Sequence, residues 1–180
     1  YVANCFAGLV REFDANSLEL LRTWEAGREP YAIHVTPLQD KLVIANRITD
    51  MKANRTMSHA NVRLIDLNSG KLDVIELYNQ HNLLHDIAVT ADGKYAFISG
   101  VSCSYTAITS QVSGGWISEN CVFCVDLETQ ELVEIYFLDD PQLGAGNPWG
   151  LDISDDGERL IVSVSGTDEI VYFPVKALLE

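Results

Sequence analysis

The sequence predicts an all-β protein, an arc of a β-propeller built from four-stranded antiparallel blades. Three observations carry this prediction. Segments of similar sequence start at residues 30, 84 and 148. A polar turn follows each segment, and a short run rich in β-branched and aromatic residues follows each turn. Further strands complete the repeats in a constant order, which favours a ring of repeated sheets over a β-sandwich, the alternative fold.

The four strands of a repeat, a to d, can be placed in order. Strand a leads into a turn that contains Asp-Gly in two repeats, and Asp-Gly between apolar runs is a strong hairpin signal. Strand a is expected at 30–36, 84–90 and 148–154, and strand b at 1–4, 41–46, 95–99 and 160–164. Strand c is expected at 10–14, 62–66, 122–126 and 170–173, and strand d at 18–24, 72–77 and 132–138.

These strands predict a single propeller domain of about four blades out of a seven-bladed ring. The blades are expected at 1–29, 30–83, 84–147 and 148–180, with three strands in the first and last and four in each of the middle two. The first residues read as the interior of a strand, so we expect the sequence to be cut from a longer chain. Any targeting segment would then lie upstream.

Charge excludes two classes of partner. The chain of 180 residues has a formal net charge of −14, with 47% hydrophobic and 21% charged residues. This is the composition of a globular domain, but its negative field repels nucleic acid and anionic membrane surfaces. No apolar run approaches the roughly 20 residues that span a bilayer. We therefore expect no nucleic-acid partner and no membrane insertion.

One face of the disc is predicted to carry function. Both long insertions, about 47–60 and 101–120, are b–c connections and lie on the same face as the d–a connections. Binding residues concentrate on long loops held by a rigid scaffold. The candidate residues for a ligand or partner on this face are Tyr31, His85, Asp86, Trp116, Asn147 and Trp149. The alternative for the aromatic members is packing between neighbouring blades.

The cysteines and histidines offer weaker signals. A disulfide between Cys103 and Cys121 would close the second insertion. The Cys121-Val-Phe-Cys124 segment lacks the following His of a haem-attachment motif, and residues three apart on a strand point to opposite faces. His81 and His85 have a spacing that would align metal ligands on a helix, but this segment is expected to be a loop entering a strand. We therefore predict neither a metal site nor a catalytic residue.

Several of these segments resemble the YVTN family of bacterial and archaeal β-propellers. The residues that carry the resemblance are Tyr1-Val-Ala-Asn4, the run from Ile87 to Tyr95, and Val62-Arg-Leu-Ile-Asp66. The stretches 111–117, 138–141, 146–151 and 165–169 are similar to a subgroup that accompanies di-haem cytochrome c peroxidase-like domains. The resemblance implies a periplasmic or extracellular protein, with haem in a fused domain and not in this chain. Asp168 departs from the His found there in the subgroup.

The sequence thus favours a non-catalytic propeller scaffold that docks a protein, a fused redox domain or a small molecule on its b–c and d–a loops. Two enzyme alternatives stay open. The first is a propeller hydrolase of the lactonase type, for which His85 and Asp86 are the nearest candidates. The second is the propeller portion of a c-type haem peroxidase-like oxidoreductase, whose haem would lie outside this chain.

Overall fold

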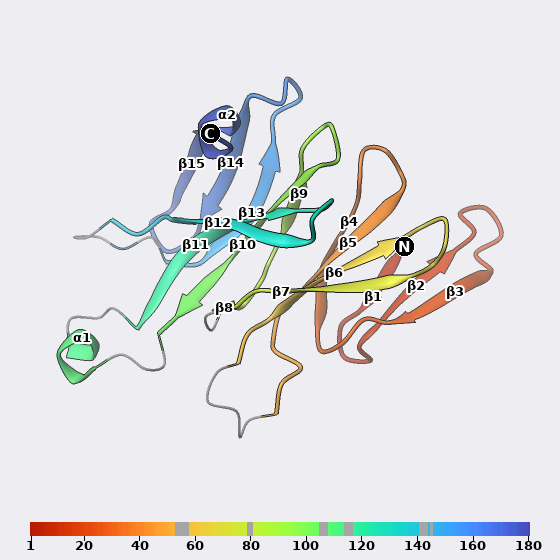
Figure 1. Ribbon diagram of the computed structural model, residues 1–180, viewed down its shortest axis with the longest axis horizontal. Coiled ribbons are helices and arrows are strands. Elements are labelled where there is room, and N and C mark those ends of the chain that lie inside the picture. Colours follow the sequence, from red (N-terminus) through yellow and green to blue (C-terminus); the bar gives the residue numbers. More distant parts are fainter. Residues whose placement is uncertain (53–57, 79–80, 105–107, 114–116, 141–143, 145) are drawn as a thin grey trace.

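The structure, a computed structural model, describes residues 1–52, 58–78, 81–104, 108–113, 117–140, 144 and 146–180. Its strands form four antiparallel sheets that follow one another along the chain (Figure 1). The first sheet consists of β1 (Val2–Asn4), β2 (Leu9–Phe13) and β3 (Leu20–Glu25). The second consists of β4 (Pro30–Val35), β5 (Lys41–Asn46), β6 (Asn61–Asp66) and β7 (Leu72–Glu76).

The third sheet differs from the others because two short strands share one neighbour. Both β8 (His81–Asn82) and β9 (Ile87–Val89) pair with β10 (Tyr95–Cys103), which continues to β11 (Ser118–Asp126) and β12 (Glu131–Phe137). The fourth sheet consists of β13 (Pro148–Ile153), β14 (Arg159–Val164) and β15 (Glu169–Pro174). Two short helices, α1 (Thr109–Ser113) and α2 (Val175–Leu178), were not expected from the sequence.

Two expectations for the third sheet are corrected. The inner strand expected at 84–90 is shorter, at Ile87–Val89, and a separate strand, β8, precedes it. Leu83 breaks the chain between the two strands, because its φ of +54° is in the left-handed region that extended strands do not use. The insertion expected at 101–120 is shorter than predicted. Its two ends continue the ladder, with Val101 opposite Asn120 and Cys103 opposite Ser118.

The turns repeat the same side-chain chemistry from blade to blade. At the c–d turns, the carboxylates of Asp14, Asp66 and Asp126 each accept hydrogen bonds from backbone N–H groups two and three residues later. At the a–b turns, the hydroxyls of Thr36, Thr90 and Ser154 donate to Asp40, Asp92 and Asp156. Such local side-chain bonds fix a turn without tertiary contacts, which explains why the turns could be predicted.

The two faces of the arc differ. The β4–β5, β9–β10 and β13–β14 turns lie together at the upper side of Figure 1, and the connections β5–β6 and β10–β11 lie at the lower left. We call the side with the β5–β6 and β10–β11 connections the loop face. As predicted, it is the elaborated side of the arc.

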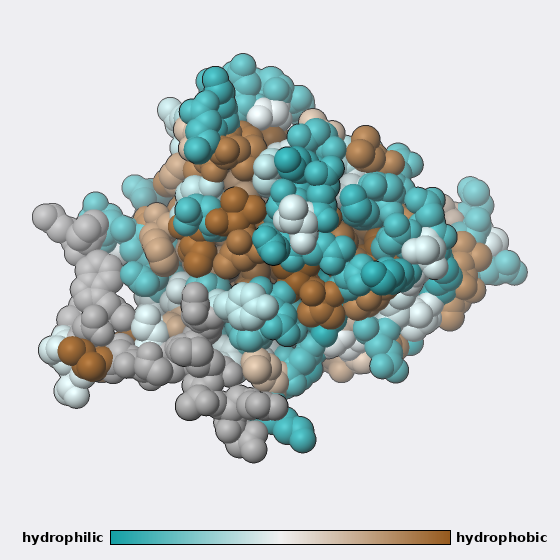
Figure 2. Space-filling model, in the orientation of Figure 1, coloured by the Kyte–Doolittle hydropathy of each residue, from teal (hydrophilic) through white to brown (hydrophobic). Residues whose placement is uncertain are grey.

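Exposed apolar side chains lie at several places on the described structure, and those on β12 and on the two terminal sheets bear on association. On β12, Val133 and Phe137 are about half exposed, and Figure 2 shows apolar surface in this region. Exposed apolar side chains also lie on the outermost strands of the two terminal sheets. They are Leu20 and Leu21 on β3, and Ile170 and Tyr172 on β15.

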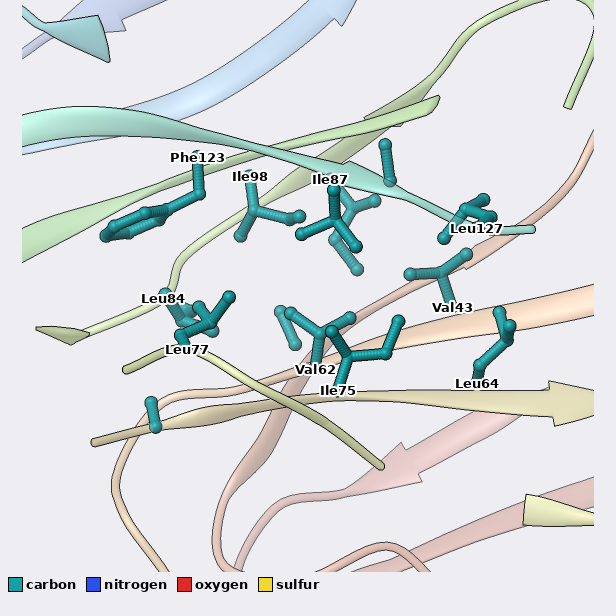
Figure 3. Packing of buried hydrophobic residues seen from close by; sticks show 14 of the residues in the cluster. Val43, Val62, Leu64, Ile75, Leu77, Leu84, Ile87, Ile98, Phe123 and Leu127 are labelled. Carbon is teal, nitrogen blue, oxygen red and sulfur yellow. The ribbon is translucent and has the colours of Figure 1, made fainter. Parts of the chain in front are cut away.

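The largest core cluster lies between the second and third sheets (Figure 3). Val43, Val62 and Ile75 point from the second sheet toward Ile98 and Phe123 of the third. Two further clusters fill the space between the first and second sheets and between the third and fourth. Consecutive sheets therefore pack face to face, and burial of their alternating apolar side chains holds the inner strands in fixed relative positions.

Candidate functional site

Three predicted site residues lie where the inner strands meet the loop face. Tyr31 is on β4, Trp149 is on β13, and His85 lies just before β9, which contacts both of these strands. Each residue follows the first position of its repeat. The repeat therefore brings three residues that are far apart in the sequence to one mouth of the arc.

The three rings form one cluster, which we call the aromatic ledge. The rings of His85 and Trp149 are stacked, with centroids 4.3 Å apart and an interplanar angle of 21°. Tyr31 meets both edge-on, at 6.1 Å from His85 and 6.4 Å from Trp149. His85 is 5% exposed, whereas Tyr31 is 38% and Trp149 44% exposed. The predicted alternative of packing between blades thus describes His85, while the other two rings also offer surface to a ligand.

Ser99 on β10 holds the ledge together. Its backbone carbonyl accepts from the His85 N–H at 3.0 Å, and its Oγ donates to the Trp149 carbonyl at 2.7 Å. The Asp86 N–H also donates to this Oγ, at 3.2 Å. Because Ser99 is fully buried and bonds to both sides, it fixes the position of β13 relative to β9.

Asp86 connects the same two blades. Its Oδ2 accepts from the Leu151 N–H at 3.1 Å and its Oδ1 from the Ile87 N–H at 2.9 Å. An added Cβ on Gly150 would lie 3.7 Å from Oδ2, so the backbone of β13 passes close to this carboxylate. Asp86 thus accepts hydrogen bonds from backbone N–H groups of two inner strands. Its carboxylate oxygens have partners within the protein, and these bonds support the ledge.

The electrostatics of the ledge favour a neutral imidazole. Burial lowers the pKa of His85, and the positive charge of Arg47 lowers it further, while Asp86 acts in the opposite direction. The guanidinium carbon of Arg47 lies 5.1 Å from the Tyr31 ring centroid, a cation–π contact. The Nδ1 atom of His85 is buried without a hydrogen-bond partner within the described structure. The ledge therefore combines two exposed rings, one cation and one neutral ring nitrogen.

Comparison with known proteins identifies the architecture. No protein-family model matches the chain. The hydrazine synthase subunit beta of Kuenenia stuttgartiensis is 23% identical over 178 residues, which are 98% of this chain and 45% of that protein. A solved hydrazine synthase structure from the same organism superposes with a TM-score of 0.82 at 19% identity, over 98% of this chain and 49% of that one.

Two further solved structures have a similar fold. "Dihydro-heme d1 dehydrogenase NirN in complex with DHE" gives a TM-score of 0.62 at 16% identity, over 94% of this chain and 31% of that one. The Pseudomonas aeruginosa periplasmic gluconolactonase PpgL gives a TM-score of 0.60 at 18% identity, over 91% of this chain and 45% of that one. The fold is a partial β-propeller, as predicted. The chain spans about half the length of the hydrazine synthase subunit that it matches.

The remaining predicted residues do not join the ledge. Asn147 is exposed, and its backbone, with a φ of +52°, binds Asn120 through its N–H and Ser165 through its carbonyl. The structure thus places Asn147 in a turn, and its role as a contact residue stays a prediction. Trp116 lies outside the described residues.

The predicted disulfide is not formed. Cys103 and Cys121 are free thiols, because Cys103 lies opposite Ser118 on the β10–β11 ladder and Cys121 lies opposite Gly100. Three residues along a strand span about 10 Å, beyond the separation that a disulfide bridges. Burial raises the pKa of Cys124 to about 12 and also raises that of Cys121.

Arg47 and the environment of His81 were not predicted from the sequence. Arg47 is the first residue after β5, and the register of the β4–β5 pair, in which Asn46 lies opposite Pro30, brings it to Tyr31. His81 is 2% exposed and packs on Phe123 with ring centroids 4.7 Å apart, a burial that was not expected of a residue in a loop entering a strand. Neither of its ring nitrogens has a hydrogen-bond partner in the described structure, and burial lowers its pKa to about 4.

The described residues contain no group of three or more His, Cys, Asp or Glu side chains placed to hold a metal ion. In the same part of the chain, no helix is long and apolar enough to cross a membrane.

Proposed function

We propose that this chain is a non-catalytic binding module of a propeller protein, and that the aromatic ledge is where a partner protein docks. The exposure of Tyr31 and Trp149 carries this proposal. Large rings that keep more than a third of their surface in solvent, while resting on a buried support, are typical anchors of protein interfaces. Arg47 adds a positively charged group beside them, and arginine is also enriched at interfaces.

The comparisons support a role in an assembly. The relative over nearly the whole of this chain is named as the beta subunit of an enzyme. We propose that this chain belongs to a larger extracytoplasmic, redox-associated protein of the YVTN propeller type. Haem, if the whole protein uses it, would lie in a fused or partner domain. The periplasmic location in the name of the gluconolactonase structure agrees with this placement.

Substitution of the ledge tests this proposal in the full-length protein. The partner is first identified by its co-purification in a constant ratio from the native host, and its dissociation constant is then measured with purified components. Trp149→Ala and Tyr31→Ala should each weaken binding at least tenfold, the loss of about 1.4 kcal/mol that a hot-spot side chain exceeds. Leu38→Ala removes an exposed apolar side chain from the β4–β5 turn on the opposite face and should leave the affinity unchanged. Equal affinities for wild type and both folded ledge variants would contradict the proposal.

A lactonase activity is the second candidate. It is favoured by the superposition on a gluconolactonase and by the unpartnered Nδ1 of His85 at the channel mouth. Hydrolysis of a sugar lactone by the full-length protein, lost in His85→Gln but kept in His34→Gln, would establish this candidate. Absence of hydrolysis, or hydrolysis insensitive to His85→Gln, would remove it.

A further inference from the structure

Arg47 is the cation of the aromatic ledge, and its backbone is held from both sides. Its N–H donates to the Glu29 carbonyl, and its carbonyl accepts from the Leu83 N–H, both at 2.8 Å. Glu29 precedes β4, and Leu83 lies between β8 and β9, so the two bonds come from opposite sides of the second blade. The backbone therefore fixes where the Arg47 side chain begins, beside Tyr31.

The charge of Arg47 is not paired with a carboxylate of the described structure. Arg22 and Arg63 each form an ion pair. The Arg47 guanidinium, by contrast, makes no ion pair and no side-chain hydrogen bond with the described residues, and it stacks over the ring of Tyr31. A guanidinium stacked on a ring keeps its N–H donors, which lie in its own plane, for a planar acceptor such as a carboxylate. Because Arg47 is half-buried and not fully covered, these donors can meet a molecule that docks on the ledge.

The carboxylate that supports the ledge does not neutralise this cation by contact. Both oxygens of Asp86 accept from backbone N–H groups, those of Ile87 and Leu151. The charge of Arg47 also acts at His85, whose pKa it lowers. The net charge of −14 opposes an anion at long range, but a Debye length of about 8 Å at physiological ionic strength screens distant charges more than a direct contact. The ledge thus offers a local anion contact.

Exposed ring surface lies beside this contact. His85 covers one face of the Trp149 ring, so the exposed part of that ring is its other face and its edge. Tyr31 touches both groups, with the Arg47 guanidinium carbon 5.1 Å and the Trp149 centroid 6.4 Å from its own centroid. In an extended peptide, side chains two residues apart point to the same side and are roughly 6–7 Å apart. Such a pair of side chains can reach Trp149 and Arg47 together.

We propose that the partner docks on the ledge through an extended acidic segment, in which a Glu or Asp lies two residues from an aromatic residue. The carboxylate accepts hydrogen bonds from the Arg47 guanidinium, and the aromatic ring stacks on Trp149 beside Tyr31. This proposal rests on the docking function proposed above and names the chemistry of the partner. A segment with a cation in place of the carboxylate is rejected, because two positive charges would then face each other.

Two peptides of equal shape test the charge contact in the full-length protein. They are the acetylated and amidated tripeptides Glu-Ser-Phe and Gln-Ser-Phe, titrated while the indole N–H resonance of Trp149 is followed by NMR. Wild type should bind the Glu peptide about tenfold more tightly, because a charge-assisted hydrogen bond is about twice as strong as a neutral one. Arg47→Met keeps a long side chain over Tyr31 without the charge and should bind both peptides equally.

Lys94→Met is the matched control. It removes the same charge from another cation that lies over a tyrosine ring, that of Tyr95, in the β9–β10 turn on the opposite face. This variant should keep the tenfold preference for the Glu peptide. Thermal unfolding checks that each variant is folded. Should Arg47→Met not fold, the Arg47 Nε–H resonance of wild type decides the question, since only the Glu peptide should shift it.

The outcomes separate this proposal from the docking function. Equal binding of the two peptides by wild type, no binding of either, or an unchanged preference in Arg47→Met would overturn the acidic segment. The docking function would still stand in each of these cases if Trp149→Ala weakens binding of the purified partner. If Trp149→Ala and Tyr31→Ala leave the affinity for that partner unchanged, the docking function itself fails.

Discussion

Asn46, at the end of β5, shows how one buried side chain can organise the loop face. It is fully buried, and its Nδ2 donates to the carbonyls of Ala26 at 2.6 Å and Arg28 at 2.8 Å. Its Oδ1 accepts from the guanidinium of Arg63, which also pairs with Asp50. The β3–β4 connection and the start of the β5–β6 connection therefore depend on this single amide.

We expect Asn46→Ala to lower the free energy of unfolding by about 2–4 kcal/mol. The substitution leaves two buried carbonyls and one guanidinium nitrogen without their partner, and each unpaired group costs about 1–3 kcal/mol before relaxation. Urea denaturation followed by circular dichroism measures the change. Asn16→Ala, in the exposed β2–β3 turn, is the control and should change stability by less than about 0.5 kcal/mol. If Asn46→Ala also lowers the free energy of unfolding by less than about 0.5 kcal/mol, water has taken over the hydrogen bonds of the amide, which contradicts the prediction.

The aspartates of the c–d turns make the free energy of unfolding depend on pH in the acidic range. Hydrogen bonds from backbone N–H groups lower the pKa of Asp14 and of Asp66 in the folded state. A carboxyl whose folded pKa is lowered stabilises the protein above its unfolded pKa, and this contribution is lost as the pH falls through the folded pKa. We therefore expect the free energy of unfolding to decline as the pH falls below about 4.

The double variant Asp14→Asn/Asp66→Asn should have a shallower decline of stability with acid, because its amides accept the same bonds without titrating. The measurement is the urea midpoint at a series of pH values from neutral to acid. Asp155→Asn, at an exposed turn position, should follow the wild-type profile. A double variant with the unchanged wild-type profile would contradict the assignment.

At the scale of elements, β10 is the strand on which the third sheet depends, and Gly100 is its tightest point. An added Cβ would lie 2.8 Å from Phe123 Cε2 and 2.9 Å from Leu84 Cδ2. We expect Gly100→Ala to destabilise the protein by about 1–3 kcal/mol, the usual cost of overpacking a core. Gly157→Ala is the control, because its Cβ meets nothing within 4 Å and only its φ of +74° opposes the substitution. Thermal unfolding that ranks the two variants in the reverse order would contradict this account of β10.

The register of β10 and β11 also predicts thiol reactivity. Cys103 is half-buried, whereas Cys121 is fully buried and its pKa is raised by desolvation. Cys103 should therefore react with a thiol reagent in the native protein, and Cys121 only after unfolding. Four titratable thiols are expected in denaturant without reductant, since all four cysteines are free. A count of two would restore the predicted disulfide.

The elements were predictable where the signals are local. Gly93 illustrates this, because its φ of +73° is what an Asp-Gly turn requires, and the turn places strands on both sides of it. The break at Leu83 was not predictable, since nothing in the residue type favours a positive φ. The ledge was predictable only as three equivalent repeat positions. The bond from Ser99 to Trp149, fifty residues away in the sequence, arises from blade packing, which the repeat pattern does not encode. The approach of Arg47 to Tyr31 depends instead on the exact register of the β4–β5 pair.

At the scale of the whole molecule, two opposing forces act between copies of the 180-residue chain. The terminal sheets expose apolar side chains, with Ile170 at 74% and Tyr172 at 67% exposed on β15. Burying such side chains against another sheet is favourable by about 25 cal/mol per Å² of apolar area. The net charge of −14 acts against association, because like-charged copies repel one another.

A higher salt concentration should therefore favour association of the chains. Raising the ionic strength to about 1 M shortens the Debye length to about 3 Å, which screens the repulsion and leaves the apolar attraction in place. We expect size-exclusion chromatography with light scattering to report larger species at high salt than at low salt. Ile170→Lys/Tyr172→Lys should remain smaller at both salt concentrations, whereas Val74→Lys, on the exposed side of β7, should behave as wild type. If the double variant associates like wild type, the apolar face of β15 is not the surface that drives association, and the exposed β3 side chains Leu20 and Leu21 become the next surface to substitute.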